Sequence, residues 1–123
     1  EGIGLYQVTQ KDGQRCSAAQ AYVLPFMAQR PNLTVEIKAQ ALKLEFDGKR
    51  AVAVEILQNG KRRVIRANKE IILAAGAFQT PQLLMLSGVG PATELQKHGI
   101  PVLKDLPGVG QNLHDHPVRW GCG

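Results

Sequence analysis

Two tight-turn signals, Asp47-Gly48 and Asn59-Gly60, constrain the fold of this chain more than any other feature. Glycine and asparagine tolerate the positive φ that a two-residue hairpin turn requires, so such dipeptides favour hairpins when alternating apolar residues flank them. Alternating segments occur before, between and after the two turns, at residues 33–46, 50–58 and 61–67. The sequence therefore predicts a three-stranded antiparallel meander.

The first of these strands changes phase partway along. Its apolar residues lie on one face up to Ala41, and from Leu42 onward they follow the opposite phase, through Leu44 and Phe46. Because strand side chains alternate with a period of two, a one-residue slip indicates a β-bulge or a break in register. We expect this irregularity beside Ala41.

A different pattern follows the meander. Residues 71–73, Ile-Ile-Leu, are continuously apolar and run into the small residues 74–77. Continuous apolarity predicts a strand buried on both faces, as in a parallel sheet. Ligands of open α/β sheets bind at the carboxyl ends of strands, where small residues permit close approach. Tight packing of a strand on a helix would explain the same residues without a ligand, so both interpretations stay open here.

Three helices are expected from capping signals. Ser17 caps a short helix that ends near Leu24, since Pro25 follows. A second helix is expected to begin at Thr80-Pro81 and to stop at Gly88. A third runs from Pro91 to His98 and ends at Gly99. Together with the meander and the buried strand, they predict a mixed α/β fold.

Composition limits the remaining possibilities. The 123 residues suffice for one domain, and both ends of the sequence look as if they continue. The net charge of +5 is spread along the chain without interleaved aromatic residues, which disfavours a nucleic-acid partner. No run approaches the ~20 apolar residues of a membrane span. The two isolated cysteines, Cys16 and Cys122, indicate a reducing, cytoplasmic environment, with peripheral membrane contact left open.

Residues 76–90 carry a longer motif. It consists of Gly76-Ala77, Thr80-Pro81, Leu83-Leu84 and the closing Ser87-Gly88-Val89-Gly90. This spacing resembles the second signature of the glucose–methanol–choline (GMC) flavoprotein oxidoreductases. Three further stretches are also similar to that family: "RCSAAQAYVLP", "KEIILAAGA" and "HGIPVLKDLPGVGQNLHDHP". The choline and alcohol dehydrogenase branch is the most similar.

The resemblance implies an FAD-dependent enzyme that oxidises an alcohol CH–OH to a carbonyl and passes hydride to the flavin. It also implies that residues 1–123 form one partial domain, an internal segment of the FAD-binding domain. The N-terminal GxGxxG unit and the downstream catalytic histidine of the family are absent from this sequence. We therefore expect no catalytic residue here and no activity from this segment alone. Its partners would be the rest of the parent chain and an alcohol substrate. The alternative is a stand-alone binding or structural module.

The same resemblance assigns candidate cofactor-binding residues. Ala41 would contact the adenine ring of FAD through its backbone, and Ala75 and Gly76 would lie near the adenosine. Asn112 and Asp115 would hold a loop near the flavin, as supports more than as direct contacts. The triplet at residues 114–116, His-Asp-His, offers too few ligands for a metal site, and no metal is expected.

Overall fold

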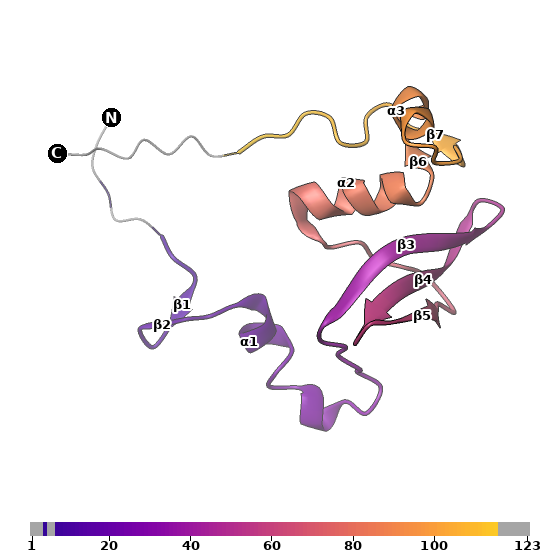
Figure 1. Cartoon of the computed structure of the whole chain (residues 1–123). Coiled ribbons are helices and arrows are strands. Elements are labelled where there is room, and N and C mark those ends of the chain that lie inside the picture. The colour runs from indigo at the N-terminus through magenta and orange to yellow at the C-terminus, as the bar shows by residue number, and fades with distance from the viewer. Residues whose placement is uncertain (1–3, 5–6, 116–123) are drawn as a thin grey trace. The chain divides into compact units, whose positions relative to one another are not determined.

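The structure is a computed structural model that describes Gly4 and residues 7–115. The chain divides into two compact units, Glu1–Ile37 and Lys38–Gly123. Each unit is described by itself. The chain contains both helices and strands (Figure 1), and the mixed α/β class is confirmed, with a three-stranded antiparallel sheet and a small parallel pair.

The N-terminal unit contains a hairpin and a short helix. Strands β1 (Gln10–Lys11) and β2 (Gln14–Arg15) pair antiparallel. Helix α1 spans Ala18–Tyr22, and a 3₁₀ turn, η1, spans Met27–Gln29. The predicted cap is confirmed, since Ser17 Oγ accepts a hydrogen bond from the Gln20 N–H at 3.2 Å. The helix ends at Tyr22, two residues earlier than expected.

The C-terminal unit begins with the predicted meander. Strands β3 (Ala39–Asp47), β4 (Arg50–Gln58) and β5 (Lys61–Arg66) pair antiparallel in that order. Both central residues of the second turn have positive φ, 52° at Asn59 and 74° at Gly60, as a type I′ turn requires. The first turn places Gly48-Lys49 at its centre, one residue later than the expected dipeptide.

The first strand is shorter than predicted. It begins at Ala39, and residues 33–37 form no strand although their apolar residues alternate; Ile37 is 70% exposed. Two causes are visible. Lys38 has a φ of 54°, which interrupts an extended chain, and Ala39 already pairs with Gln58, the last residue of β4. The residues upstream of Ala39 lie beyond the end of β4 and do not extend this ladder.

The predicted bulge is confirmed at its expected place. Ala41 pairs with Ile56 and Lys43 with Glu55, so Leu42 has no residue opposite it. A second register shift, between Glu45 and Phe46, was not predicted. The extra residue at Leu42 bends β3 immediately after Ala41.

The buried strand expected at residues 71–73 is not observed. This segment is irregular, links β5 to the next helix in Figure 1, and leaves Ile72 78% exposed. The sequence prediction was wrong here because burial on both faces depends on neighbouring strands. None of the strands among the described residues pairs with this segment.

Helix α2 spans Gly76–Leu86 and starts earlier than expected. Thr80 lies inside the helix, where its Oγ1 accepts a hydrogen bond from the Ala75 N–H at 3.1 Å. The helix N-cap is Ala75, and Pro81 is interior. Pro81 removes one backbone donor near the exposed start of the helix, where the orphaned carbonyl of Ala77 can reach water.

The C-terminal end of α2 joins a compact corner. Gly88 follows the helix with a φ of 84°, which confirms it as the stop. Strand β6 (Val89–Gly90) pairs in parallel with β7 (Lys104–Asp105), and helix α3 (Ala92–Lys97) connects them, followed by Gly99. α2 lies against β3 (Figure 1). The buried apolar side chains among the described residues are those of Leu44, Ala53, Ile56, Leu83, Val89 and Leu95.

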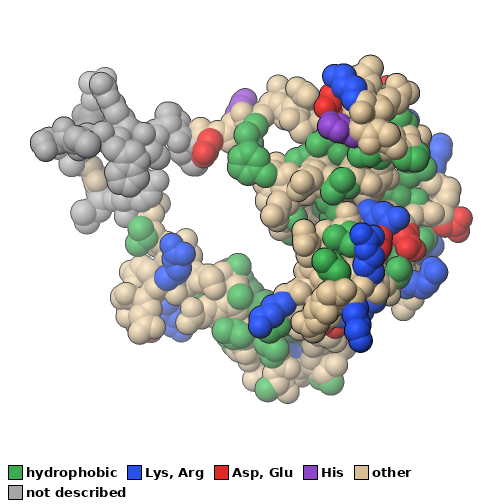
Figure 2. Space-filling model, in the orientation of Figure 1, with side chains coloured by type: hydrophobic (Ala, Val, Ile, Leu, Met, Phe, Trp, Pro, Cys, Tyr) green, Lys and Arg blue, Asp and Glu red, His purple; other side chains and the backbone are tan. Residues whose placement is uncertain are grey.

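Charged side chains gather on the meander, where Lys and Arg are prominent in Figure 2. Glu55 is the acidic centre of one cluster, with its side chain 13% exposed. Arg62 Nη1 lies 3.0 Å from its Oε1, and Lys43 Nζ lies 3.6 Å from its Oε2. The Arg62 hydrogen bond is the main cause that lowers the pKa of Glu55, and the charges of both cations add to it against partial burial.

This cluster predicts an acid-sensitive contribution to stability. Because the folded-state pKa of Glu55 is lowered, its contribution is present above the ordinary glutamate pKa and is lost as the pH falls through the folded value. Chemical denaturation at several pH values should show a smaller loss of stability on acidification in Glu55→Gln than in the wild type. The same dependence of stability on pH in Glu55→Gln and in the wild type would contradict the assignment.

Candidate functional site

A hollow between strand β3 and helix α2 contains two of the predicted site residues. It encloses about 340 Å³. We call it the β3–α2 hollow; its lining residues are Ala39, Gln40, Ala41, Leu42, Ala75, Gln79, Gln82, Leu83 and Leu86. Its volume is at the small end of the range for ligand sites, roughly 300–1,000 Å³, which suits one ring system better than a whole dinucleotide.

The bulge and the small side chains shape this hollow. Leu42 interrupts the ladder directly after Ala41, so the backbone of β3 bends where it lines the cavity. Ala41 and Ala75 contribute only methyl groups, which leaves room for a flat group between β3 and α2. Leu83 is buried and forms an apolar part of the wall. The arrangement offers backbone polar groups and apolar surface together, as an aromatic heterocycle requires.

Glutamine side chains supply most of the polar chemistry of the hollow. Gln79 and Gln82 are three residues apart on α2 and therefore share a face of the helix, and Gln40 comes from β3. Each amide presents both a donor and an acceptor. The sequence analysis missed these three residues. The helical spacing of Gln79 and Gln82 would have indicated these two, had the helix been expected to begin at Gly76 and not at Thr80.

The structure brings Ala41 and Ala75 together in one hollow, but Gly76 is not part of its lining. Gly76 starts α2 with a φ of 86°, is exposed, and does not line the hollow. No atom lies within 4 Å of where its Cβ would be. The positive φ, and not a close contact, is what favours glycine at this position.

Asn112 lines a second hollow, on a different face of α2. This 110–114 hollow encloses about 410 Å³. Its lining comes from α2 and from the loop that follows β7: Ala77, Phe78, Pro81, Met85, Gly110, Gln111, Asn112, Leu113 and His114. Phe78 is 74% exposed and forms an apolar rim. Asp115 is exposed and lines neither hollow. The supporting role expected of Asn112 and Asp115 stays a prediction.

The Ser-Gly-Val-Gly motif has a packing explanation. A Cβ at Gly88 would lie 2.5 Å from the Pro101 carbonyl oxygen, and a Cβ at Gly90 would lie 2.8 Å from Met85 Cγ. The Gly88 carbonyl accepts hydrogen bonds from the N–H groups of Leu103 and Lys104. Gly88 therefore permits the close approach of two backbone segments, and Gly90 leaves room for the Met85 side chain. Neither glycine lines the β3–α2 hollow or the 110–114 hollow.

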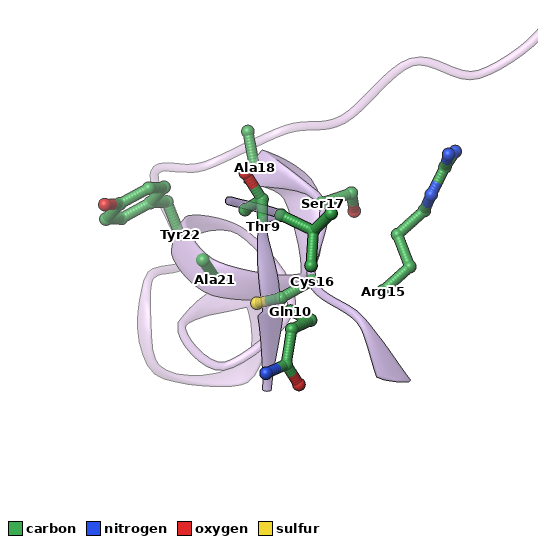
Figure 3. A pocket seen from close by; sticks show the side chains of 9 residues that line it. Thr9, Gln10, Arg15, Cys16, Ser17, Ala18, Ala21 and Tyr22 are labelled. Carbon is green, nitrogen blue, oxygen red and sulfur yellow. The ribbon is translucent and has the colours of Figure 1, made fainter. Parts of the chain in front are cut away.

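The N-terminal unit has a broader hollow of about 1020 Å³ that contains none of the predicted site residues. Figure 3 shows Cys16 beside Gln10 there, with Tyr22 and Arg15 on opposite sides. Cys16 has a free thiol. Cys122 and His116 lie outside the described residues. Within the described part of the chain, no group of three His, Cys, Asp or Glu side chains could hold a metal ion. No helix there is long and apolar enough to cross a membrane.

Comparison with known proteins gives one consistent family. The family model of the GMC oxidoreductases matches residues 1–118. The chain is 50% identical over 118 residues to an alcohol dehydrogenase [acceptor] from Pseudomonas putida, covering 94% of this chain and 21% of that protein. It is 50% identical over 116 residues to the mitochondrial choline dehydrogenase of Homo sapiens, covering 94% of this chain and 19% of that protein. The chain thus spans about a fifth of the length of these curated relatives.

Solved structures agree with this result. Pyridoxine 4-oxidase from Mesorbium loti superposes with a TM-score of 0.74 at 33% sequence identity, over 80% of this chain and 19% of that one. An FAD-dependent oxidoreductase from Chaetomium thermophilum superposes with a TM-score of 0.65 at 39% identity, over 68% of this chain and 15% of that one. The similarity therefore extends from sequence to backbone.

Proposed function

This chain belongs to the GMC oxidoreductase family, and from that premise we propose that it is an internal segment of the FAD-binding domain of a longer alcohol-oxidising enzyme. Two relatives that cover most of this chain are named alcohol dehydrogenase and choline dehydrogenase, and one structural neighbour is named FAD-dependent. The observation that carries the proposal is the β3–α2 hollow, which unites Ala41 and Ala75 from distant parts of the sequence.

The hollow fits the adenine part of FAD. Its volume of about 340 Å³ accommodates a heterocycle, and the irregular backbone at Ala41 and Leu42 can offer polar groups to a ring edge. We assign adenine contact to the Ala41 backbone and contact with the adenosine to Ala75, while Gly76 gives α2 its start. Gln79 and Gln82 add amide groups that can bind polar atoms of the adenosine.

Residues outside the β3–α2 hollow are assigned to the flavin end of the cofactor. We assign Asn112 and Asp115 to the support of the loop beside it, since Asn112 lines the 110–114 hollow. Bound FAD would supply the hydride acceptor for alcohol oxidation, and the protein would supply position and electrostatics. None of the described residues is assigned to proton transfer, so catalysis would need residues from the rest of the parent chain.

Exposed apolar residues support a larger domain. Ile72 and Phe78 are 78% and 74% exposed, and burying such side chains contributes about 1.5–3 kcal/mol each. The substrate class is an alcohol, choline or another, and a cytoplasmic location remains a prediction from the cysteine pattern.

A spectrum tests this function. The intact protein, expressed from the full reading frame and purified after incubation with FAD, should be yellow and retain stoichiometric flavin through gel filtration. Anaerobic addition of choline or of simple primary alcohols should bleach the flavin absorbance with at least one substrate. A colourless intact protein would refute the proposal, and a yellow protein that no alcohol reduces would refute the substrate class.

A further inference from the structure

Ser87 joins both walls of the β3–α2 hollow through one hydroxyl group. Its Oγ accepts a hydrogen bond from the Leu44 N–H of β3 at 2.8 Å and donates to the Leu83 carbonyl of α2. Both contacts are partly buried, and the Leu44 contact spans 43 positions of sequence. Leu83 lines the hollow itself, and Leu44 lies two residues beyond the bulge at Leu42.

The Leu44 amide needs such a partner. β3 is an edge strand of the meander, so its amides that point away from β4 have no strand neighbour. A buried N–H without an acceptor is destabilising. Ser87 satisfies this amide at the point where α2 ends, and Gly88 anchors the same turn on its other side through its bonds to Leu103 and Lys104.

We propose that Ser87 is a positioning residue that fixes the register of the β3 bulge against α2, and so sets the shape of the β3–α2 hollow for the adenosine of FAD. This inference rests on the proposed function. The bulge makes β3 locally irregular beside Ala41, so this part of the strand can shift against α2 while its pairing with β4 is kept. The Ser87 hydroxyl holds β3 on the side that β4 does not reach.

Loss of the Ser87 hydroxyl should affect cofactor binding more than folding. The pairing of β3 with β4 and the core around Ile56 do not require Ser87, so Ser87→Ala should keep the meander folded. The hollow would lose its defined width, because β3 could shift relative to α2. This change should weaken only the contacts made by the adenosine part of the cofactor. FMN, which lacks that part, therefore serves as the matched ligand.

The experiment titrates the intact apoprotein with FAD and with FMN. We expect Ser87→Ala to bind FAD about tenfold more weakly, the effect of one unsatisfied buried donor, and to bind FMN within about twofold of the wild type. Ser87→Thr keeps the hydroxyl and should restore FAD binding. Ser17→Ala, which removes a comparable backbone-capping hydroxyl in the N-terminal unit, should leave both affinities unchanged.

Hydrogen exchange gives a second measurement. The Leu44 amide should exchange faster in Ser87→Ala than in Ser87→Thr or the wild type, while amides inside β4 keep their protection. The proposal would be overturned if Ser87→Ala kept the wild-type ratio of FAD to FMN affinity, whether both affinities stayed the same or both fell equally. Ala41→Tyr distinguishes the proposed adenosine site from the positioning role of Ser87. If Ala41→Tyr weakens FAD binding selectively and Ser87→Ala does not, only the role of Ser87 is refuted. If Ala41→Tyr did not change FAD binding, both the adenosine site and the positioning role of Ser87 would be refuted.

Discussion

Gly88→Ala will destabilise the intact protein by about 2–5 kcal/mol, although it adds a single methyl group. Gly88 has a φ of 84°, a region that costs an L-residue about 1–2 kcal/mol. The new Cβ would also lie 2.5 Å from the Pro101 carbonyl oxygen. That oxygen is backbone, and two hydrogen bonds to the Gly88 carbonyl hold the segment in place. Overpacking of this kind costs about 1–3 kcal/mol more. Equilibrium denaturation would measure the sum.

Gly99→Ala is the matched control. Gly99 also follows a helix with positive φ, 67°, but no atom lies within 4 Å of its Cβ position. It should therefore show only the conformational part of the effect, about 1–2 kcal/mol. Equal destabilisation by the two substitutions would contradict the close packing at Gly88, and a neutral Gly88→Ala would contradict both terms.

Local chemistry predicted much of the fold. The meander follows from two turn signals with their own φ requirements, and the bulge follows from a phase slip visible within β3. The cap at Ser17 and the stop at Gly88 depend on residues within one helical turn. Such features need no distant partner, so they can be predicted from the local sequence.

The errors have the opposite origin. The strand expected at residues 71–73 needs neighbouring strands, and apolarity alone does not supply them. The early start of α2 depends on the Thr80 hydroxyl, which accepts from the Ala75 amide and does not cap a helix that begins at Thr80. Lys38 interrupts the first alternating segment through a positive φ, which is unusual for a lysine.

The candidate site shows the same division. Ala41 and Ala75 were named from a family resemblance, and their meeting in one hollow depends on the packing of α2 on β3. The glutamines at positions 79 and 82 became visible only with the correct helix boundary. Ser87 was part of a recognised motif, but its bond to Leu44 joins two segments 43 positions apart, which no local pattern encodes.

Ala41→Tyr should have the largest effect on cofactor binding. A tyrosine ring at this position would occupy the β3–α2 hollow, where Ala41 now contributes a methyl group. The strand itself should tolerate the change, because aromatic residues favour β-structure and Ala41 is exposed. We expect FAD affinity to fall about a hundredfold, equivalent to about 2.7 kcal/mol. Val64→Tyr, at an exposed position of β5 outside both hollows, should bind FAD normally.

The most direct measurement of the central claim is a titration of the intact wild-type and Ala41→Tyr apoproteins with FAD and with FMN, followed by flavin fluorescence. If the hollow between β3 and α2 holds the adenosine, Ala41→Tyr will lose most of its preference for FAD over FMN while its FMN affinity stays at the wild-type value. An unchanged preference, with the variant folded as judged by circular dichroism, would show that the adenosine binds elsewhere.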